Sequence, residues 1–224
     1  MTKTNQPEST NVGGGDIDVD NLMDTLRTHS REFTIGAVAV VVLAGGLLLW
    51  RQSSLQKDAR AEKALSDATI EFQSGNRPLA RADLGKLVTR YLDTRAGVEA
   101  AMIAAQIDFE DAQWANGLQV LEDAKKSSMI SQYAGPVDGL IGGALADQKK
   151  FDEAAKRYLA AADESEYQAM KDTYQADAAR VLAIAGKKDE ARKIWEAIAS
   201  RLDSPLAGEA KVRLGELGAV AAKN

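Results

Sequence analysis

The sequence contains no cysteine, which excludes disulfide bonds, thiolate metal sites, iron–sulfur clusters and cysteine nucleophiles together. It contains one histidine, His29, beside Arg27 and Arg31 and outside the region that carries a repeat pattern. A catalytic base needs an oriented partner and a pocket, so we expect His29 to belong to a polar flank.

Neither the clustered carboxylates nor the clustered glycines indicate a metal or phosphate site. The alternating aspartates of residues 16–20 lack the glycine turn and the bidentate glutamate of a calcium loop. The glycines of residues 135–143 follow no strand pattern and precede no Lys-Ser or Lys-Thr pair, so a phosphate loop is not indicated. We predict no enzyme, no metal, no cofactor and no small-molecule substrate.

Aromatic residues and prolines are scarce as well. Aromatics make up 5% of 224 residues although 45% are hydrophobic, and only four prolines occur. The apolar content is therefore mostly alanine, leucine, valine and isoleucine, which favours closely packed helices over a sheet sandwich. The net charge of −5 comes without a basic stripe, so we expect no nucleic-acid partner.

One long apolar run, FTIGAVAVVVLAGGLLLW at residues 33–50, has no charge between Glu32 and Arg51. Eighteen residues at about 1.5 Å each span about 27 Å, just enough for a bilayer core. Phe33 and Trp50 stand at its ends, where aromatic rings prefer the interface, and Arg51 follows. We predict a transmembrane helix in residues 21–52; a signal peptide or a buried soluble helix is the alternative.

The charges that flank the span bear on its orientation in the membrane. Two basic residues precede the span and four follow it within residues 51–63, which favours a cytoplasmic C-terminal side. Residues 1–20 are polar and should form a disordered tail. No proline or glycine interrupts residues 51–73, so we expect the span to continue as a helix into the next domain.

An internal period of 37 residues organises the rest of the chain. Each copy holds a small residue, a large apolar residue four places on and an apolar residue seven places on, which is one face of a helix. The four copies are Ala80, Leu84, Leu87; Gly117, Leu121, Ala124; Ala154, Tyr158, Ala161; and Ala191, Trp195, Ile198.

A second small position precedes the first by twelve residues in every copy: Ala68, Ala105, Gly142 and Ala179. Turn-forming residues separate the two positions in three copies, and copy two has only Asp111 to Gln113 there. Small residues at two fixed places let paired helices cross closely, so each copy predicts a helical hairpin. Such units stack into a solenoid because none can bury its apolar face alone.

The stretch at residues 202–210 echoes residues 92–100 and predicts a C-terminal capping helix. The sequence thus predicts an all-α protein with one transmembrane helix and about four hairpins in residues 53–218. Residues 219–224 should form a flexible C-terminus.

Copy three resembles the tetratricopeptide repeat (TPR), through Gly142, Leu145, Phe151, Ala154 and Tyr158. The acidic tail, the span ending in Trp-Arg and the degenerate repeats together resemble the ancillary SecYEG translocon subunit family (YfgM-type). The resemblance implies a single-pass protein of the bacterial inner membrane, with a cytoplasmic N-terminus and periplasmic repeats that bind protein partners. This orientation opposes the charge count, but long domains translocate largely regardless of nearby charge.

By analogy with this family, we expect partner contact on the inner-face positions Met102, Gln106, Gly139, Gly143, Ala176 and Arg180. Gly139 and Gly143 lie one helical turn apart, where glycine is costly, which indicates either very close packing or local looseness. Trp114 and Trp195 fall at core positions of the repeat.

Two functions fit these expectations. One is an adaptor or chaperone-like subunit of the Sec translocon, and the other is a structural accessory subunit of a large respiratory or photosynthetic assembly. In both, the partners are proteins of an inner-membrane complex together with the lipid bilayer.

Overall fold

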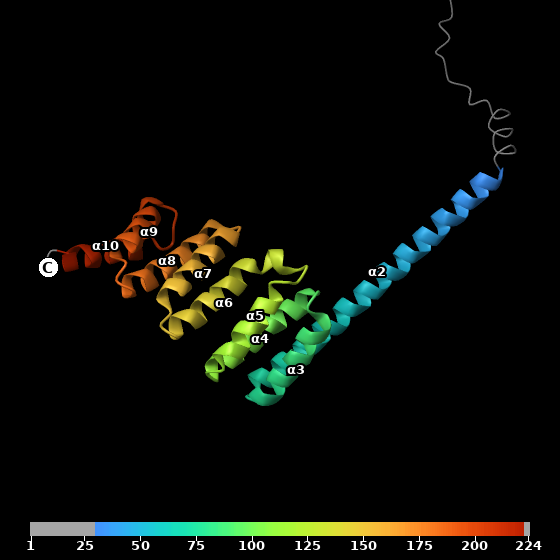
Figure 1. Cartoon of the computed structure of the whole chain (residues 1–224), viewed down its shortest axis with the longest axis horizontal. Coiled ribbons are helices and arrows are strands. Elements are labelled where there is room, and N and C mark those ends of the chain that lie inside the picture. Colours follow the sequence, from blue (N-terminus) through green and yellow to red (C-terminus); the bar gives the residue numbers. More distant parts are fainter. Residues whose placement is uncertain (1–29, 222–224) are drawn as a thin grey trace, which may run out of the picture. The chain divides into compact units, whose positions relative to one another are not determined.

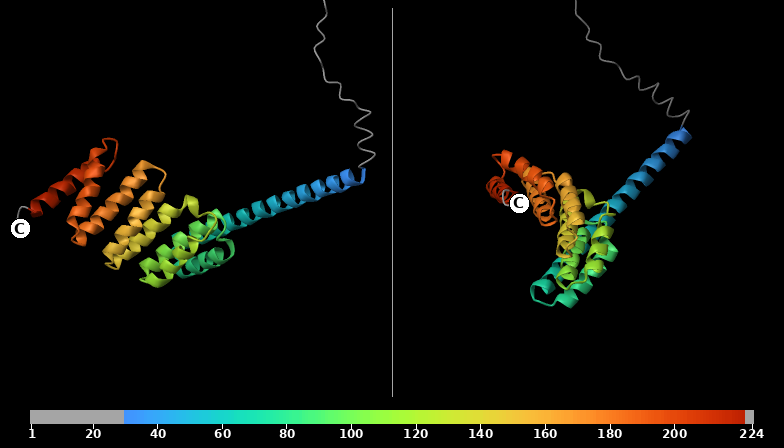
Figure 2. Two further views of the ribbon diagram at one scale, coloured as in Figure 1. Left: turned by 45° about the horizontal axis from the view of Figure 1, so that its top comes forward. Right: turned by 60° about the vertical axis from the view of Figure 1, so that its left-hand side comes forward.

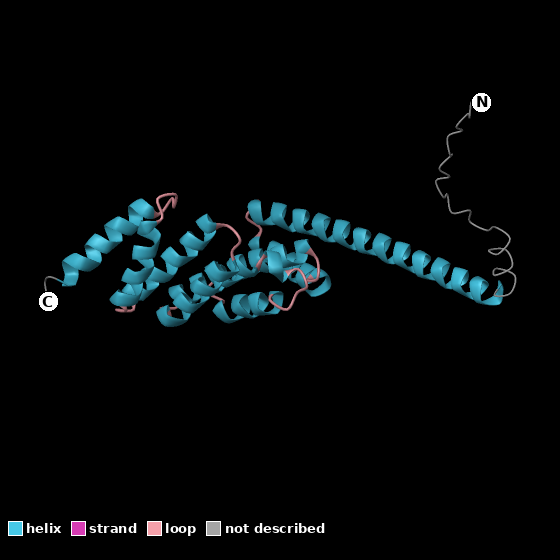
Figure 3. Cartoon of the chain, turned by 90° about the horizontal axis from the view of Figure 1, so that it is seen from above, coloured by secondary structure: helices cyan, strands magenta, loops and turns pink. Residues whose placement is uncertain are grey.

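The computed structural model of the chain describes residues 30–221, with side chains from residue 38 to residue 218. The tail at residues 1–20, His29 and the Phe33 side chain therefore lie outside the described part, as do residues 222–224. The described part is helical, with no strand (Figure 3). Its helices are α2 (Ser30–Gln73), α3 (Arg77–Tyr91), α4 (Arg95–Glu110), α5 (Trp114–Ala124), α6 (Ala134–Asp147), α7 (Phe151–Glu164), α8 (Gln168–Ile184), α9 (Lys188–Ser200), α10 (Ala207–Ala221) and the short 3-10 helix η1 (Ile130–Gln132).

The chain divides into two units, Met1–Ser54 and Leu55–Asn224. In the first unit, the described side chains of α2 are exposed almost without exception, including Val41, Leu43 and Leu49. One helical segment of the described chain, Val38–Gln73, is long and apolar enough to cross a membrane. Helix α2 is continuous from Ser30 to Gln73, as the lack of proline and glycine after residue 50 predicts.

The second unit is a stack of helical hairpins (Figures 1 and 2). The end of α2 pairs with α3, and the pairs α4–α5, α6–α7 and α8–α9 follow. Helix α10 packs on α9 and ends at Ala221. The predicted all-α solenoid of hairpins with a capping helix is confirmed.

The turns inside the hairpins follow the 37-residue period strictly. First helices end at residues 73, 110, 147 and 184, and second helices begin at residues 77, 114, 151 and 188. In the middle of each turn, one residue has a left-handed backbone: Gly75 (φ 85°), Ala112 (φ 56°), Lys149 (φ 60°) and Gly186 (φ 82°). Copy two, which lacks the turn residues of the other copies, forms the same turn.

Two backbone hydrogen bonds repeat in each turn. In the turn between α2 and α3, the amide of Gly75 donates to the carbonyl of Phe72 (3.1 Å), and the amide of Asn76 donates to the carbonyl of Glu71 (3.0 Å). The same pair recurs one period later, from Ala112 to Phe109 and from Gln113 to Asp108. This is the Schellman pattern, which satisfies the last carbonyls of a helix and needs a left-handed residue.

The repeated apolar positions form the core. Of the twelve, all are buried except Tyr158, which is half-buried. The second small position is buried in every copy. Trp195 is 1% exposed, whereas Trp114 is only half-buried and stacks on Phe109 with 5.9 Å between ring centroids. Trp114 is therefore at the margin of the core.

Close helix crossings explain the small residues. A Cβ at Gly117 in α5 would stand 2.4 Å from the Phe109 ring of α4. A Cβ at Gly142 in α6 would stand 2.9 Å from the Tyr158 ring of α7. An aromatic ring from the partner helix thus takes the space of the missing side chain in both hairpins.

Candidate functional site

The six predicted contact residues lie on the first helices of three successive hairpins, α4, α6 and α8. Their exposure differs. Gln106 is exposed, Arg180 is half-buried, Met102 packs partly against the core, and Ala176 is fully buried. Ala176 offers no surface to a partner, so Gln106 and Arg180 are the members of the set with polar groups in reach of solvent.

The glycine pair of α6 is closely packed rather than loose. A Cβ at Gly139 would stand 2.6 Å from the ring of Tyr174, which belongs to α8. A Cβ at Gly143 would stand 3.6 Å from the Tyr158 hydroxyl. The chain's own tyrosines therefore fill the space beside both glycines, and burial raises the pKa of Tyr158 to about 12 and that of Tyr174 above its ordinary value.

Arg180 is the centre of a charged cluster that joins α8 to α10. Its guanidinium donates to both carboxylate oxygens of Glu209, from Nη2 at 2.9 and 2.8 Å and from Nε at 3.1 Å. It also binds Asp177, one turn earlier in α8. The guanidinium carbon lies 5.7 Å from the ring centroid of the buried Trp195, in cation–π range.

The cluster sets opposite pKa shifts on its two acids. Hydrogen bonding from Arg180 holds the pKa of Glu209 below its ordinary value. Burial raises the pKa of Asp177, although Arg180 opposes that rise. Arg180 is thus a positioned structural cation, whose planar fork matches a carboxylate.

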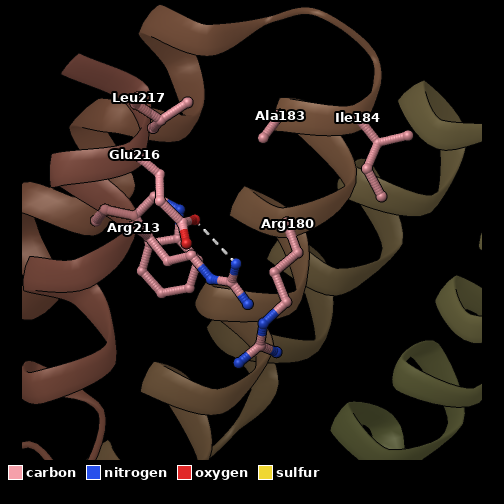
Figure 4. Close-up of a pocket in the computed structure, with 7 residues that line it drawn as sticks. Arg180, Ala183, Ile184, Arg213, Glu216 and Leu217 are labelled. Atoms are coloured by element: carbon pink, nitrogen blue, oxygen red, sulfur yellow. Dashed lines mark hydrogen bonds and ion pairs between the residues drawn. The ribbon is translucent and has the colours of Figure 1, made fainter. Parts of the chain in front are cut away.

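Beside this cluster lies a pocket of about 330 Å³ (Figure 4). Trp195 of α9 lines it together with Ala183 and Ile184 of α8 and Leu217 of α10. The polar lining comes from Arg180, Arg213 and Glu216, and the last two form an ion pair at 3.0 Å. The pocket is of a size and polarity for an apolar side chain of a protein partner.

Sequence reasoning identified Arg180 but missed the α10 side of this pocket. Arg213, Glu216 and Leu217 lie on α10, which follows the fourth and last copy of the repeated apolar positions. Their only sequence signal was the echo of residues 92–100, which predicts the helix and not its inner face.

Within the described residues, no group of three or more histidines, cysteines or acids could hold a metal ion. The predicted membrane-interface residues Trp50 and Arg51 are exposed on α2. They belong to the first unit, whereas the pocket belongs to the second.

Comparison with known proteins agrees with this architecture. Residues 26–219 match the tetratricopeptide repeat-like domain. Among solved structures, the chain is similar to one described as the functional characterization of Pseudomonas aeruginosa PilF, with a TM-score of 0.57 at 17% identity. That similarity covers 75% of this chain and 71% of the other. No curated protein matches the chain.

The likeness to PilF concerns the fold alone, since the identity is low. The family match covers most of the chain and includes every hairpin described above. This fold is in general a protein-interaction domain rather than a catalytic one. The chain belongs to the tetratricopeptide repeat-like domain family.

Proposed function

We propose that the protein is a single-pass scaffold of the bacterial inner membrane that binds protein partners, as an adaptor or chaperone-like subunit of the Sec translocon. The observation that carries the proposal is helix α2, which runs without a break from an exposed apolar stretch into the first hairpin of a repeat domain. A scaffold of this kind would act beside a membrane complex.

The inner face offers the contacts. Gln106 and Arg180 present polar groups, and the pocket floored by Trp195 accepts an apolar side chain. The surface carries no strong charge of one sign, which suits partners of varied sequence. The lipid bilayer is the second partner, with Phe33, Trp50 and Arg51 at its interfaces.

Purification of the tagged full chain from native membranes in mild detergent tests this proposal. We expect translocon subunits and mixed clients in the eluate, at less than stoichiometric amounts. A matched pair of variants refines the result: Arg180 and Arg192 have nearly equal side-chain exposure, 34% and 33%, but only Arg180 is a predicted inner-face position. Arg180→Ala should reduce the clients and Arg192→Ala should not.

An eluate without translocon subunits or clients would refute the translocon proposal. A stoichiometric large assembly would instead identify a structural accessory subunit of a respiratory or photosynthetic complex. The glycine pair of α6 gives no separate support for such a docking role, because the chain's own tyrosines fill it.

The proposed orientation has the N-terminus in the cytoplasm and the repeats in the periplasm. Protease added to intact spheroplasts should then degrade the repeat domain. Full protection of that domain, with degradation only after lysis, would reverse the orientation.

A further inference from the structure

The connection between α9 and α10, residues 201–206, holds the most exposed large apolar side chain of the described part. Leu202 is 90% exposed, more than any side chain of the apolar stretch in α2. Tyr167 precedes α8 and is 70% exposed, and Met170 in the first turn of α8 is 42% exposed. Three large apolar side chains are thus exposed at the two connections that precede α8 and α10. These connections lie on the same edge of the stack (Figure 1).

A buried carboxylate joins these two connections. Asp172 of α8 is 0% exposed, and its Oδ1 accepts hydrogen bonds from Arg201 Nη2 (2.6 Å) and Gln168 Nε2 (2.7 Å). Arg201 is the chain neighbour of Leu202, and Gln168 is the chain neighbour of Tyr167. The two exposed apolar residues are therefore each next in sequence to a residue that binds Asp172.

Leu92 is the counterpart of Leu202 in an earlier connection, and the next connection along the stack packs against it. Leu92, between α3 and α4, is only half-buried, and its carbonyl accepts a hydrogen bond from Ser127 Oγ at 2.6 Å. Ser127 belongs to the next connection of the same edge, between α5 and α6. No described residue packs on the Leu202 connection in this way. The surface around Leu202 is therefore left uncovered by the described part of the chain.

The charges around these residues have one predominant sign. Asp163 and Glu164 end α7, Glu166 precedes Tyr167, and Asp203 follows Leu202; all four are exposed. Of the cations within four residues of Tyr167 or Leu202 along the chain, Arg201 is already bound to Asp172, which leaves Lys171. A partner that covers the apolar residues must therefore lie close to these carboxylates. A partner with basic groups at its flanks would complement their charge best.

From this placement we infer that the surface binds a protein segment in which apolar residues are flanked by lysine or arginine. We call it the loop face, formed by Tyr167, Met170 and Leu202 with Asp163, Glu164, Glu166 and Asp203. The inference rests on the proposed scaffold function and adds the chemistry of the partner. It also places the contact on the edge of the stack, away from the inner face.

The test uses the full chain in nanodiscs of neutral lipid and two labelled peptides. One has leucines flanked by lysines, and the other has the same leucines flanked by glutamates; empty nanodiscs supply the background. Fluorescence anisotropy should show binding of the lysine peptide, weakened by salt, and much weaker binding of the glutamate peptide.

Two matched variants locate the contact. Leu202→Ser should weaken the lysine peptide about tenfold, as expected when one leucine loses its apolar contact. Ile70→Ser removes a side chain of 60% exposure near a hairpin turn outside the loop face and should leave the affinity unchanged. Circular dichroism confirms that both variants keep their helices.

Equal affinity of wild type and Leu202→Ser would overturn the inference, and so would equal binding of the two peptides. Self-association of the chain that Leu202→Ser abolishes would overturn it as well, because the occupant would then be a second copy. Loss of native partners from Arg180→Ala, with lysine-peptide binding by the wild-type chain retained, reports on the inner face. Equal peptide binding by wild type and Leu202→Ser, with native partners retained in the eluate, reports on the loop face.

Discussion

The Phe109 ring of α4 occupies the space in which a Cβ at Gly117 of α5 would stand, 2.4 Å from the nearest ring carbon. Phe109 is half-buried and also stacks on Trp114, so it has little freedom to move aside. The smallest residue of the period and the aromatic ring opposite it thus form one packing unit.

Gly117→Ala should therefore lower the free energy of unfolding of the repeat domain by about 1–3 kcal/mol, because overpacking forces the ring or the helices apart. Denaturant unfolding of the full chain in detergent, followed by circular dichroism, measures the change. Gly215→Ala is the control, since a Cβ there meets nothing within 4 Å. That helical substitution should raise stability by about 0.5–1 kcal/mol. A Gly117→Ala protein as stable as wild type would mean that Phe109 relaxes freely.

The left-handed residues of the hairpin turns give a second prediction. Ala112 and Lys149 adopt a backbone conformation that costs an L-residue about 1–2 kcal/mol, whereas glycine adopts it freely. Ala112→Gly and Lys149→Gly should each stabilise the domain by about 0.5–1 kcal/mol after the added entropy of the unfolded chain is subtracted.

Thermal unfolding checks the sign. Ala197→Gly, an exposed position within α9, should destabilise by up to about 1 kcal/mol, which shows that glycine helps only in the turns. Destabilisation by both turn variants would contradict the conformational argument.

Asp172 gives a pH-dependent prediction. Burial disfavours its charged form, but the hydrogen bonds to it outweigh burial and the pKa of Asp172 lies below its ordinary value. Asp172→Asn should destabilise by about 1–3 kcal/mol, because the partly buried Arg201 loses its charged partner.

The pH dependence follows from that lowered pKa. The stabilisation is fully present above the unfolded pKa of about 3.9 and is lost as the pH falls through the folded pKa. The difference between wild type and variant should stay constant from neutral pH down to about pH 5 and shrink below about pH 4. A difference that does not change with pH would assign the loss to packing alone.

Tyr158 should ionise late. Its ring lies against Gly142, and burial raises its pKa to about 12. The neutral phenol is the favoured form in the folded chain, so its contribution to stability is complete below pH of about 10 and declines as the pH rises through about 12. Absorbance titration of tyrosinate should show this late component, and Tyr158→Phe should remove it. A component from Tyr158 at the ordinary tyrosine pKa would place the ring in solvent.

Much of the fold was predictable because the packing repeats along the chain. Ala80 and Leu84, like their counterparts in later copies, pack at the crossing of two paired helices. Each crossing requires residues of similar size, so these sizes recur with a period of 37 residues. The candidate site was less predictable. The glycine at position 139 indicated either close packing or local looseness, and nothing in the sequence indicated that Tyr174, two helices later, would fill the space beside it.

The sequence by itself determined the helices, the apolar stretch in α2, the register of the four hairpins and the small residues at their crossings. These features depend on local propensity and on contacts that recur at a constant separation. Only the tertiary structure decided the close approach of Tyr174 to Gly139, the pairing of Arg180 with Glu209 and the exposure of Leu202. Each of these depends on which distant segments meet, and the spacing of residues along the chain does not reveal such contacts.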